Sequence, residues 1–136
     1  MFNEDYIVND FGNAHNIAIN TSSGFAYILG SALYEGGPVF YDISIPEQPI
    51  LRGGFSDTSY IHDAQIITYK GEDQNYFGKE ILLGSNSDGG ETNQLIILDV
   101  TEKTNPVGKY HIQSLRMPLS RGRVWRGVPA AEMAPS

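Results

Sequence analysis

Cysteine is absent from the 136-residue chain, tryptophan occurs once and histidine three times. Without cysteine the chain can form neither disulfides nor thiolate metal sites. A continuous apolar stretch of about 18 residues is also lacking, which argues against a membrane-spanning helix. The first residues, Met1 to Asp5, have neither a basic region nor an apolar core, so no signal peptide is expected there.

Basic residues are few in most of the chain. Residues 1–110 contain five Lys or Arg and fifteen Asp or Glu, a balance of −10, whereas residues 111–136 contain four Arg and one Glu, a balance of +3. The acidic part would repel phosphate groups, so we expect no nucleic-acid partner. A phosphate-binding loop, a His-Glu-x-x-His motif and a Ser-His-Asp arrangement are all lacking. The sequence therefore favours a non-enzymatic protein and leaves an enzymatic activity open.

Two stretches of the chain resemble each other. The segment 39–50 recurs as 96–107, and each copy is an apolar run that ends in Asp and leads into a turn with Pro. The equivalent pairs, each 57 residues apart, are Asp42 with Asp99 and Pro49 with Pro106. Further equivalences precede them, because 15–19 aligns with 62–66 and 25–30 aligns with 79–84. A repeat of this length can decide the fold.

Each repeat unit contains four short apolar segments separated by turn residues. Residues rich in Val, Ile, Tyr and Phe favour strands, and Gly, Pro, Asn and Asp favour the turns between them. The expected strands are 15–20, 25–30, 38–42, 50–55, 64–69, 80–83, 94–100 and 107–112. Four strands in about 50 residues is the size of one propeller blade. We therefore predict an all-β, β-propeller-like fold with about two four-stranded antiparallel blades, 15–56 and 62–113.

This fold would be an incomplete propeller, because a closed one has at least about four blades. The strand pattern also stops after residue 113, where three Pro and four Arg follow without alternation. We expect residues 114–136 to form an irregular or disordered tail. Open strand edges at the ends of two blades would make self-association possible.

Several motifs carry a likeness to a known family. The string Gln94–Thr101 resembles the LVIVD repeat, and the motifs in 15–17, 60–65, 78–81 and 105–107 together resemble the choice-of-anchor B family. The resemblance implies that residues 1–113 are a fragment of a longer β-propeller that is extracellular or at the cell surface. It implies no enzymatic activity, and it implies loops that contact a protein or a glycan. No anchor signal is evident in the chain.

Two histidines hold equivalent places at the start of the first strand of each unit. His15 and His62 would line the central channel of a propeller, where imidazoles could bind a transition metal. Asp63 beside His62 could join such a site or form a catalytic pair, although neighbours on a strand point to opposite faces. The alternative function is therefore a metal-dependent or enzymatic site in the channel of the complete propeller. We favour the structural interpretation, in which each imidazole hydrogen-bonds a loop carbonyl or an Asp.

Other polar residues have simpler explanations. Asp42 and Asp99, with Pro49 and Pro106, are expected to build a rigid corner in which the carboxylates accept hydrogen bonds from backbone N–H groups. Oxygen ligands suitable for Ca²⁺ occur in the loop expected at 84–93, namely Asn86, Asp88 and Glu91. This loop lacks the spacing of an EF-hand, so a solvated acidic loop is the preferred interpretation.

Overall fold

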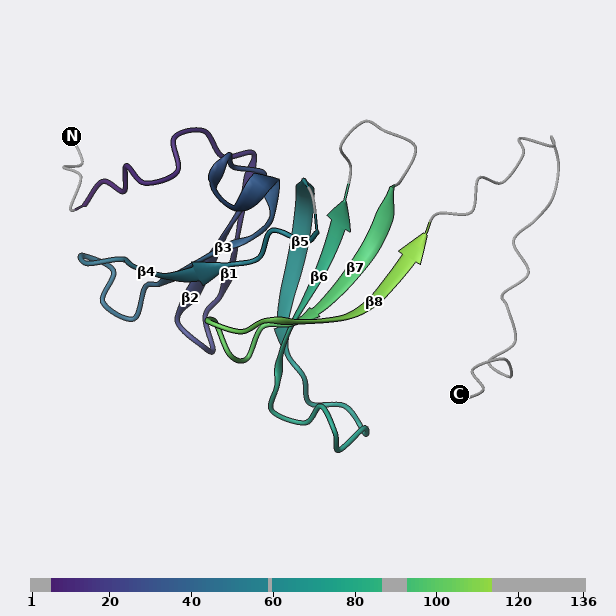
Figure 1. Ribbon diagram of the computed structural model, residues 1–136. Helices are drawn as coiled ribbons and strands as arrows, with labels where there is room; N and C mark the ends of the chain where they lie inside the picture. Colours follow the sequence, from purple (N-terminus) through teal and green to yellow (C-terminus); the bar gives the residue numbers. More distant parts are fainter. Residues whose placement is uncertain (1–5, 59, 87–92, 114–136) are drawn as a thin grey trace, which may run out of the picture.

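The computed structural model describes residues 6–58, 60–86 and 93–113, which form two four-stranded antiparallel sheets (Figure 1). Sheet A contains β1 (Asn16–Asn20), β2 (Phe25–Leu29), β3 (Val39–Asp42) and β4 (Ile50–Gly54). Sheet B contains β5 (Ile61–Thr68), β6 (Glu80–Asn86), β7 (Gln94–Asp99) and β8 (Val107–Gln113). In both sheets the strands lie in the order of the sequence. The prediction of an all-β chain with two such sheets is confirmed.

The turns between strands follow the positions of glycine and proline. Gly24 closes the β1–β2 turn with φ of 71°, and its N–H donates to the carbonyl of Asn20 at 3.0 Å. A side chain at Gly24 would also meet Ser44 Oγ at 2.8 Å. Between β2 and β3 the expected loop contains one short 3-10 turn, η1 (Leu33–Gly36). No helix in the part of the chain that the structure describes could cross a membrane.

The pairing register corrects the alignment of β2 with β6. Phe25 faces Asp42, and Ile81 faces Asp99, so Phe25 is equivalent to Ile81. The sequence alignment instead makes Phe25 equivalent to Lys79, which lies two residues before Ile81. A shift of two residues keeps every side chain on the same face, so apolar patterns alone do not distinguish the two alignments. Gly30 and Gly84, which the sequence alignment matched, are therefore not equivalent.

The third and fourth strands of the two sheets are alike in register. Asp42 faces Ile50, and Asp99 faces Val107. Both pairs of strands also contain an irregularity one step before the Asp, between Phe40 and Tyr41 and between Ile97 and Leu98. Such a bulge bends a strand and increases its twist. The two sheets therefore turn in the same way toward their corners.

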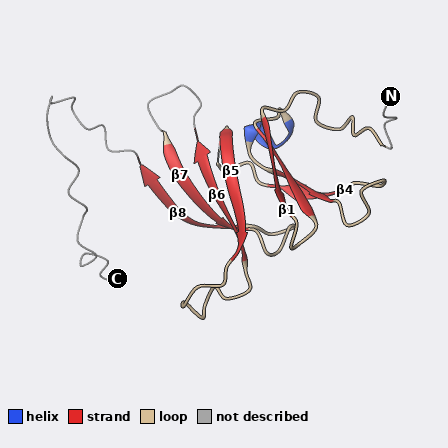
Figure 2. Ribbon diagram, turned by 180° about the vertical axis from the view of Figure 1, so that it is seen from behind, coloured by secondary structure: helices blue, strands red, loops and turns tan. Residues whose placement is uncertain are grey.

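One hydrophobic core joins the sheets. Strands β1 and β5 lie against each other, so the sheets diverge from neighbouring edges, as both views show (Figures 1 and 2). The core between them is formed by fully buried residues of both sheets: Tyr27, Leu29, Phe40, Ile61, Leu82, Ile96, Leu98 and Val100. Ala18 of β1 and Ala64 and Ile66 of β5 pack against it. Sheet A and sheet B therefore depend on each other for burial.

Two strands are longer than the sequence predicted by at least two residues. Strand β5 begins at Ile61, and β6 continues to Asn86, because Gln94 of β7 still pairs with Asn86. Residues 84–86 are therefore strand, not loop as expected. Asp88, Glu91 and the tail 114–136 lie outside the described residues.

Candidate functional site

The two repeat histidines meet where β1 and β5 begin. The rings of His15 and His62 have centroids 4.1 Å apart and planes tilted by 52°, and both residues are exposed. The ring of Tyr60 lies 5.9 Å from that of His15. Gly30 lies beneath them with φ of 64°, and a side chain there would come within 2.8 Å of His15 Cβ and of the Tyr60 ring. A small aromatic cluster thus forms at one end of the contact between the sheets.

Asp63 is used for contact between the sheets. Its Oδ1 accepts hydrogen bonds from Asn16 Nδ2 at 3.0 Å and from the Ala64 N–H at 2.8 Å. The register of β5 is irregular between Ile61 and Asp63, so strict alternation of faces does not hold at His62. Within the described ranges no group of three or more His, Cys, Asp and Glu side chains is placed to hold a metal ion. The pair of imidazoles therefore has no third ligand of this kind there.

The repeated aspartates lie at the corners after β3 and β7. Oδ1 of Asp42 accepts a hydrogen bond from the Ser44 N–H at 3.1 Å, and Oδ1 of Asp99 accepts one from the Thr101 N–H at 3.2 Å. Each also has a cationic partner, Arg52 at 2.9 Å for Asp42 and Lys79 at 3.0 Å for Asp99. Nearby, Pro49 and Pro106 are half-buried.

These contacts lower the pKa of both carboxyl groups. For Asp42 the main cause is the backbone hydrogen bond from Ser44. For Asp99 burial acts in the opposite direction, but the hydrogen bonds from the Thr101 hydroxyl and from Lys79 outweigh it. Both aspartates are thus held ionised and occupied by local partners.

Asn86, which the sequence predicts in the acidic loop, lies in a strand. It is the last residue of β6 and is 7% exposed, and its side-chain amide donates to the carbonyl of Thr58. The amide joins β6 to the segment that connects the sheets. The sequence predicts a loop at Asn86 because the apolar run ends before it. Its pairing with Gln94 extends the strand beyond that run.

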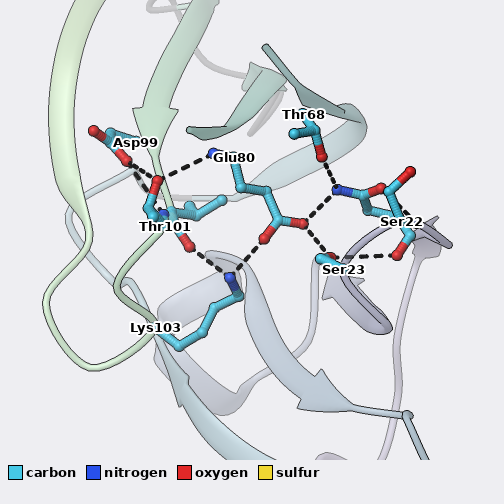
Figure 3. Close-up of polar contacts among 9 residues, drawn as sticks. Ser22, Ser23, Thr68, Glu80, Asp99, Thr101 and Lys103 are labelled. Atoms are coloured by element: carbon cyan, nitrogen blue, oxygen red, sulfur yellow. Dashed lines mark hydrogen bonds and ion pairs between the residues drawn. The ribbon is translucent and has the colours of Figure 1, made fainter. Parts of the chain in front are cut away.

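A polar contact that the sequence analysis did not identify fastens the two sheets together (Figure 3). Glu80 of β6 accepts hydrogen bonds from Asn20 at 2.7 Å and Ser23 at 2.6 Å, at the β1–β2 turn of sheet A. Its other oxygen lies 2.7 Å from Nζ of Lys103, which comes from the corner after β7. We call these four residues the inter-sheet lock. Asn20 also donates to Thr68 of β5 at 3.2 Å.

The lock is shielded from solvent. The side chains of Glu80 and Lys103 are only 7% and 10% exposed. The ammonium group of Lys103 also donates to the carbonyl of Val100 at 2.7 Å and lies 4.2 Å from the centre of the Phe25 ring, a cation–π contact between the sheets. Alternation along β6 places Glu80 on the same face as the core residue Leu82. This alternation can be read from the sequence, but the residues that contact Glu80 depend on how the two sheets pack.

Burial and ion pairing have opposite effects in the lock. Burial alone would raise the pKa of Glu80, but hydrogen bonds from Lys103, Ser23 and Asn20 outweigh it and hold the pKa below its ordinary value of 4.5. The pKa of the Tyr27 hydroxyl is raised by burial and by the nearby Glu80 charge. The lock is therefore a carboxylate–ammonium pair at neutral pH.

We expect the free energy of unfolding to decrease as the pH falls below about 4.5. Glu80 binds its proton more weakly in the folded chain, so the unfolded state takes up more protons and stability is lost as the pH falls through the folded pKa. Above the unfolded pKa this contribution is fully present. Urea unfolding followed at pH 7, 5, 4 and 3 measures the slope, and Glu80→Gln should reduce it. An unchanged slope in Glu80→Gln would contradict the assignment to Glu80.

The loop at residues 70–78, between β5 and β6, projects from one end of sheet B (Figure 1). The Tyr69 N–H donates to the Lys79 carbonyl at 2.8 Å, and the Gly78 N–H donates to the Tyr69 carbonyl at 2.9 Å. The rings of Tyr69 and Tyr76 meet edge to face at 6.2 Å, and the Lys79 ammonium lies 5.5 Å from the Tyr76 ring. Phe77 is 59% exposed. We call this segment the aromatic loop.

Hydrogen bonds that involve an acidic and an amide residue also order the aromatic loop. Oδ1 of Asp73 accepts hydrogen bonds at 3.0 Å from both the backbone N–H and the side-chain amide of Asn75. The Asp73 N–H donates to the Tyr69 hydroxyl at 3.4 Å. The sequence predicted only a polar loop here and assigned no role to its residues, because the contact between the Tyr69 and Tyr76 rings depends on how the hairpin folds.

Comparisons with models of protein families, with curated proteins and with solved structures found no match to this chain.

Proposed function

We propose that the chain is a non-enzymatic interaction module that presents its loops to a protein or a glycan. In this proposal the two sheets are blades of a β-propeller related to LVIVD-repeat, choice-of-anchor B proteins, and the protein works outside the cell or at its surface. The motifs that resemble this family support it. So does the arrangement of the sheets, which share one core and have their first strands side by side.

The aromatic loop is the observation that carries the proposal. An exposed phenylalanine on a loop fixed by its own hydrogen bonds and ring contacts has no role in the cores described above. Aromatic side chains supply much of the contact energy at binding surfaces, and a loop that is already ordered loses little entropy on binding. Exposed acidic residues of the same loop, Glu72 and Asp73, add hydrogen-bond acceptors.

A binding screen of the full chain tests this function. We expect the labelled chain to bind selected members of a glycan array or of an array of purified extracellular proteins, and we expect Phe77→Ala to weaken that binding by at least about tenfold. The matched control is Ile45→Ala, because Ile45 is similarly exposed, at 57%, in the corner after β3. Binding on neither array, or binding that both variants weaken equally, would contradict the proposal. Which array responds decides between glycan and protein.

A second candidate is the metal-dependent or enzymatic site built on the repeat histidines. It is favoured by the 4.1 Å separation of the His15 and His62 rings, which would let both imidazoles reach one ion. Against it stands the absence of a third His, Cys, Asp or Glu ligand nearby in the described ranges. Stoichiometric zinc, retained by the chain and lost in His62→Ala, would favour this candidate over the interaction module.

A further inference from the structure

Each sheet has a second, outer face that the shared core does not use. On sheet A, Ile17 and Ile19 alternate with the core-packed Ala18 and are 54% and 51% exposed. On sheet B, residues that alternate with core positions of β6 and β7 point away from sheet A. They are Leu83, Leu95 and Ile97, of which Leu95 is 43% exposed. A row of aliphatic side chains on an open sheet face, unlike a single exposed one, indicates a contact surface.

The registers show what these outer faces correspond to. Tyr27 faces Phe40 on the core side of sheet A, and at the equivalent positions Leu83 faces Ile97 on the outer face of sheet B. The outer face of sheet B thus repeats the face that sheet A presents to sheet B.

The reverse equivalence holds for the first strands. Ala18 faces Tyr27, and Gln65 faces Leu83, so Ile17 and Ile19 occupy the places of Ala64 and Ile66. Ala64 and Ile66 pack against the shared core. The outer face of sheet A therefore corresponds to the core face of sheet B, and the outer face of sheet B corresponds to the core face of sheet A.

From this correspondence we propose that a second copy of the chain binds head to tail. The outer face of sheet A of one copy, at Ile17 and Ile19, packs on the outer face of sheet B of the next, at Leu83, Leu95 and Ile97. On sheet A the β2–β3 part of the outer face is already covered by Val8 and Phe11 of the N-terminal segment, so the contact centres on β1. Such a contact uses different surfaces on the two copies, and it builds a ring if the rotation closes.

The contact between copies lacks the buried carboxylate of the internal one. Gly24 occupies the place in sheet A that Glu80 occupies in sheet B, since Phe25 is equivalent to Ile81. The outer contact therefore has no carboxylate to form a second inter-sheet lock. It is apolar and depends little on salt, because no ion pair is formed in it.

Light scattering coupled to size exclusion, over a series of chain concentrations, tests the proposal. We expect the wild-type chain to associate in a concentration-dependent way at both low and high salt. Ile17→Lys on sheet A and Leu95→Lys on sheet B should each weaken association by about a hundredfold or more, because a buried ammonium would have no partner. Ile45→Lys, at an exposed corner position, is the matched control and should associate like the wild type.

Mixing the two variants separates head-to-tail association from other kinds. Ile17→Lys keeps an intact sheet B face, and Leu95→Lys keeps an intact sheet A face, so an equimolar mixture should form a one-to-one dimer that grows no further. A mixture that stays monomeric would overturn the proposal. A wild-type chain that is monomeric at all concentrations, or variants that associate like the wild type, would also overturn it. Far-ultraviolet circular dichroism of each variant checks that the sheets are retained.

Discussion

Replacing Phe40 by alanine is expected to lower the free energy of unfolding by about 3–5 kcal/mol, the usual cost of removing a buried aromatic side chain. Phe40 is fully buried in β3 and meets the Tyr27 ring edge to face at 5.4 Å. Removing it leaves a cavity in the core that both sheets share, and the contacts of the ring with Tyr27 are also lost. Urea unfolding monitored by circular dichroism measures the change.

Because the core is common to both sheets, Phe40→Ala should weaken sheet B as well as sheet A. Hydrogen exchange of the β6 and β7 amides should therefore accelerate together with that of β2 and β3. The matched control is Phe77→Ala, which removes the same atoms from a 59% exposed position and should change stability by less than about 0.5 kcal/mol. Faster exchange confined to sheet A would mean that the sheets unfold independently, and the single core would then be the wrong description.

Replacing Lys103 by methionine is expected to destabilise the chain by a similar amount, about 3–5 kcal/mol. Methionine keeps most of the volume and loses the charge, so Glu80 would remain buried and ionised with only the hydroxyl and amide donors of sheet A. The cation–π contact with Phe25 would be lost as well. Urea unfolding at pH 7, where the carboxylate is ionised, measures the effect.

Two further variants show whether the loss comes from the unpaired charge. Adding Glu80→Gln to Lys103→Met should restore much of the stability, because the neutral amide no longer needs an ammonium partner. Arg52→Met removes the cation of a solvent-exposed ion pair, with Asp42, and should change stability very little. If Lys103→Met were as mild as Arg52→Met, the inter-sheet lock would not fasten the sheets.

The eight strands could be predicted from the sequence because their residues alternate or run continuously apolar between turn formers. Their ends were less accurate, since β5 and β6 are extended by pairing with neighbours and not by their own composition. At Asn86, a polar residue that favours loops, the pairing with Gln94 decided the outcome. The local preference of Asn86 predicts a loop, whereas its pairing within the sheet makes it part of β6.

The candidate site could be predicted only where the repeat itself gave the information. Equivalent places for His15 and His62 followed from the alignment, and their ring contact depends on β1 and β5 lying side by side. The inter-sheet lock joins residues 60 positions apart in the sequence, as between Asn20 and Glu80. No pattern within one repeat unit identifies such partners, because the four residues are not repeated as a set.

The alternation of side chains along strands such as β2 and β6 has a consequence for engineering the chain. Side chains alternate between faces, so a strand in either sheet can be lengthened or shortened by two residues and still direct the same residues to the core. A change of one residue would reverse the two faces from that point to the next turn, unless a bulge absorbed it, as between Phe40 and Tyr41. Changes in the length of these strands should therefore be made in even steps, and odd ones placed at the existing bulges.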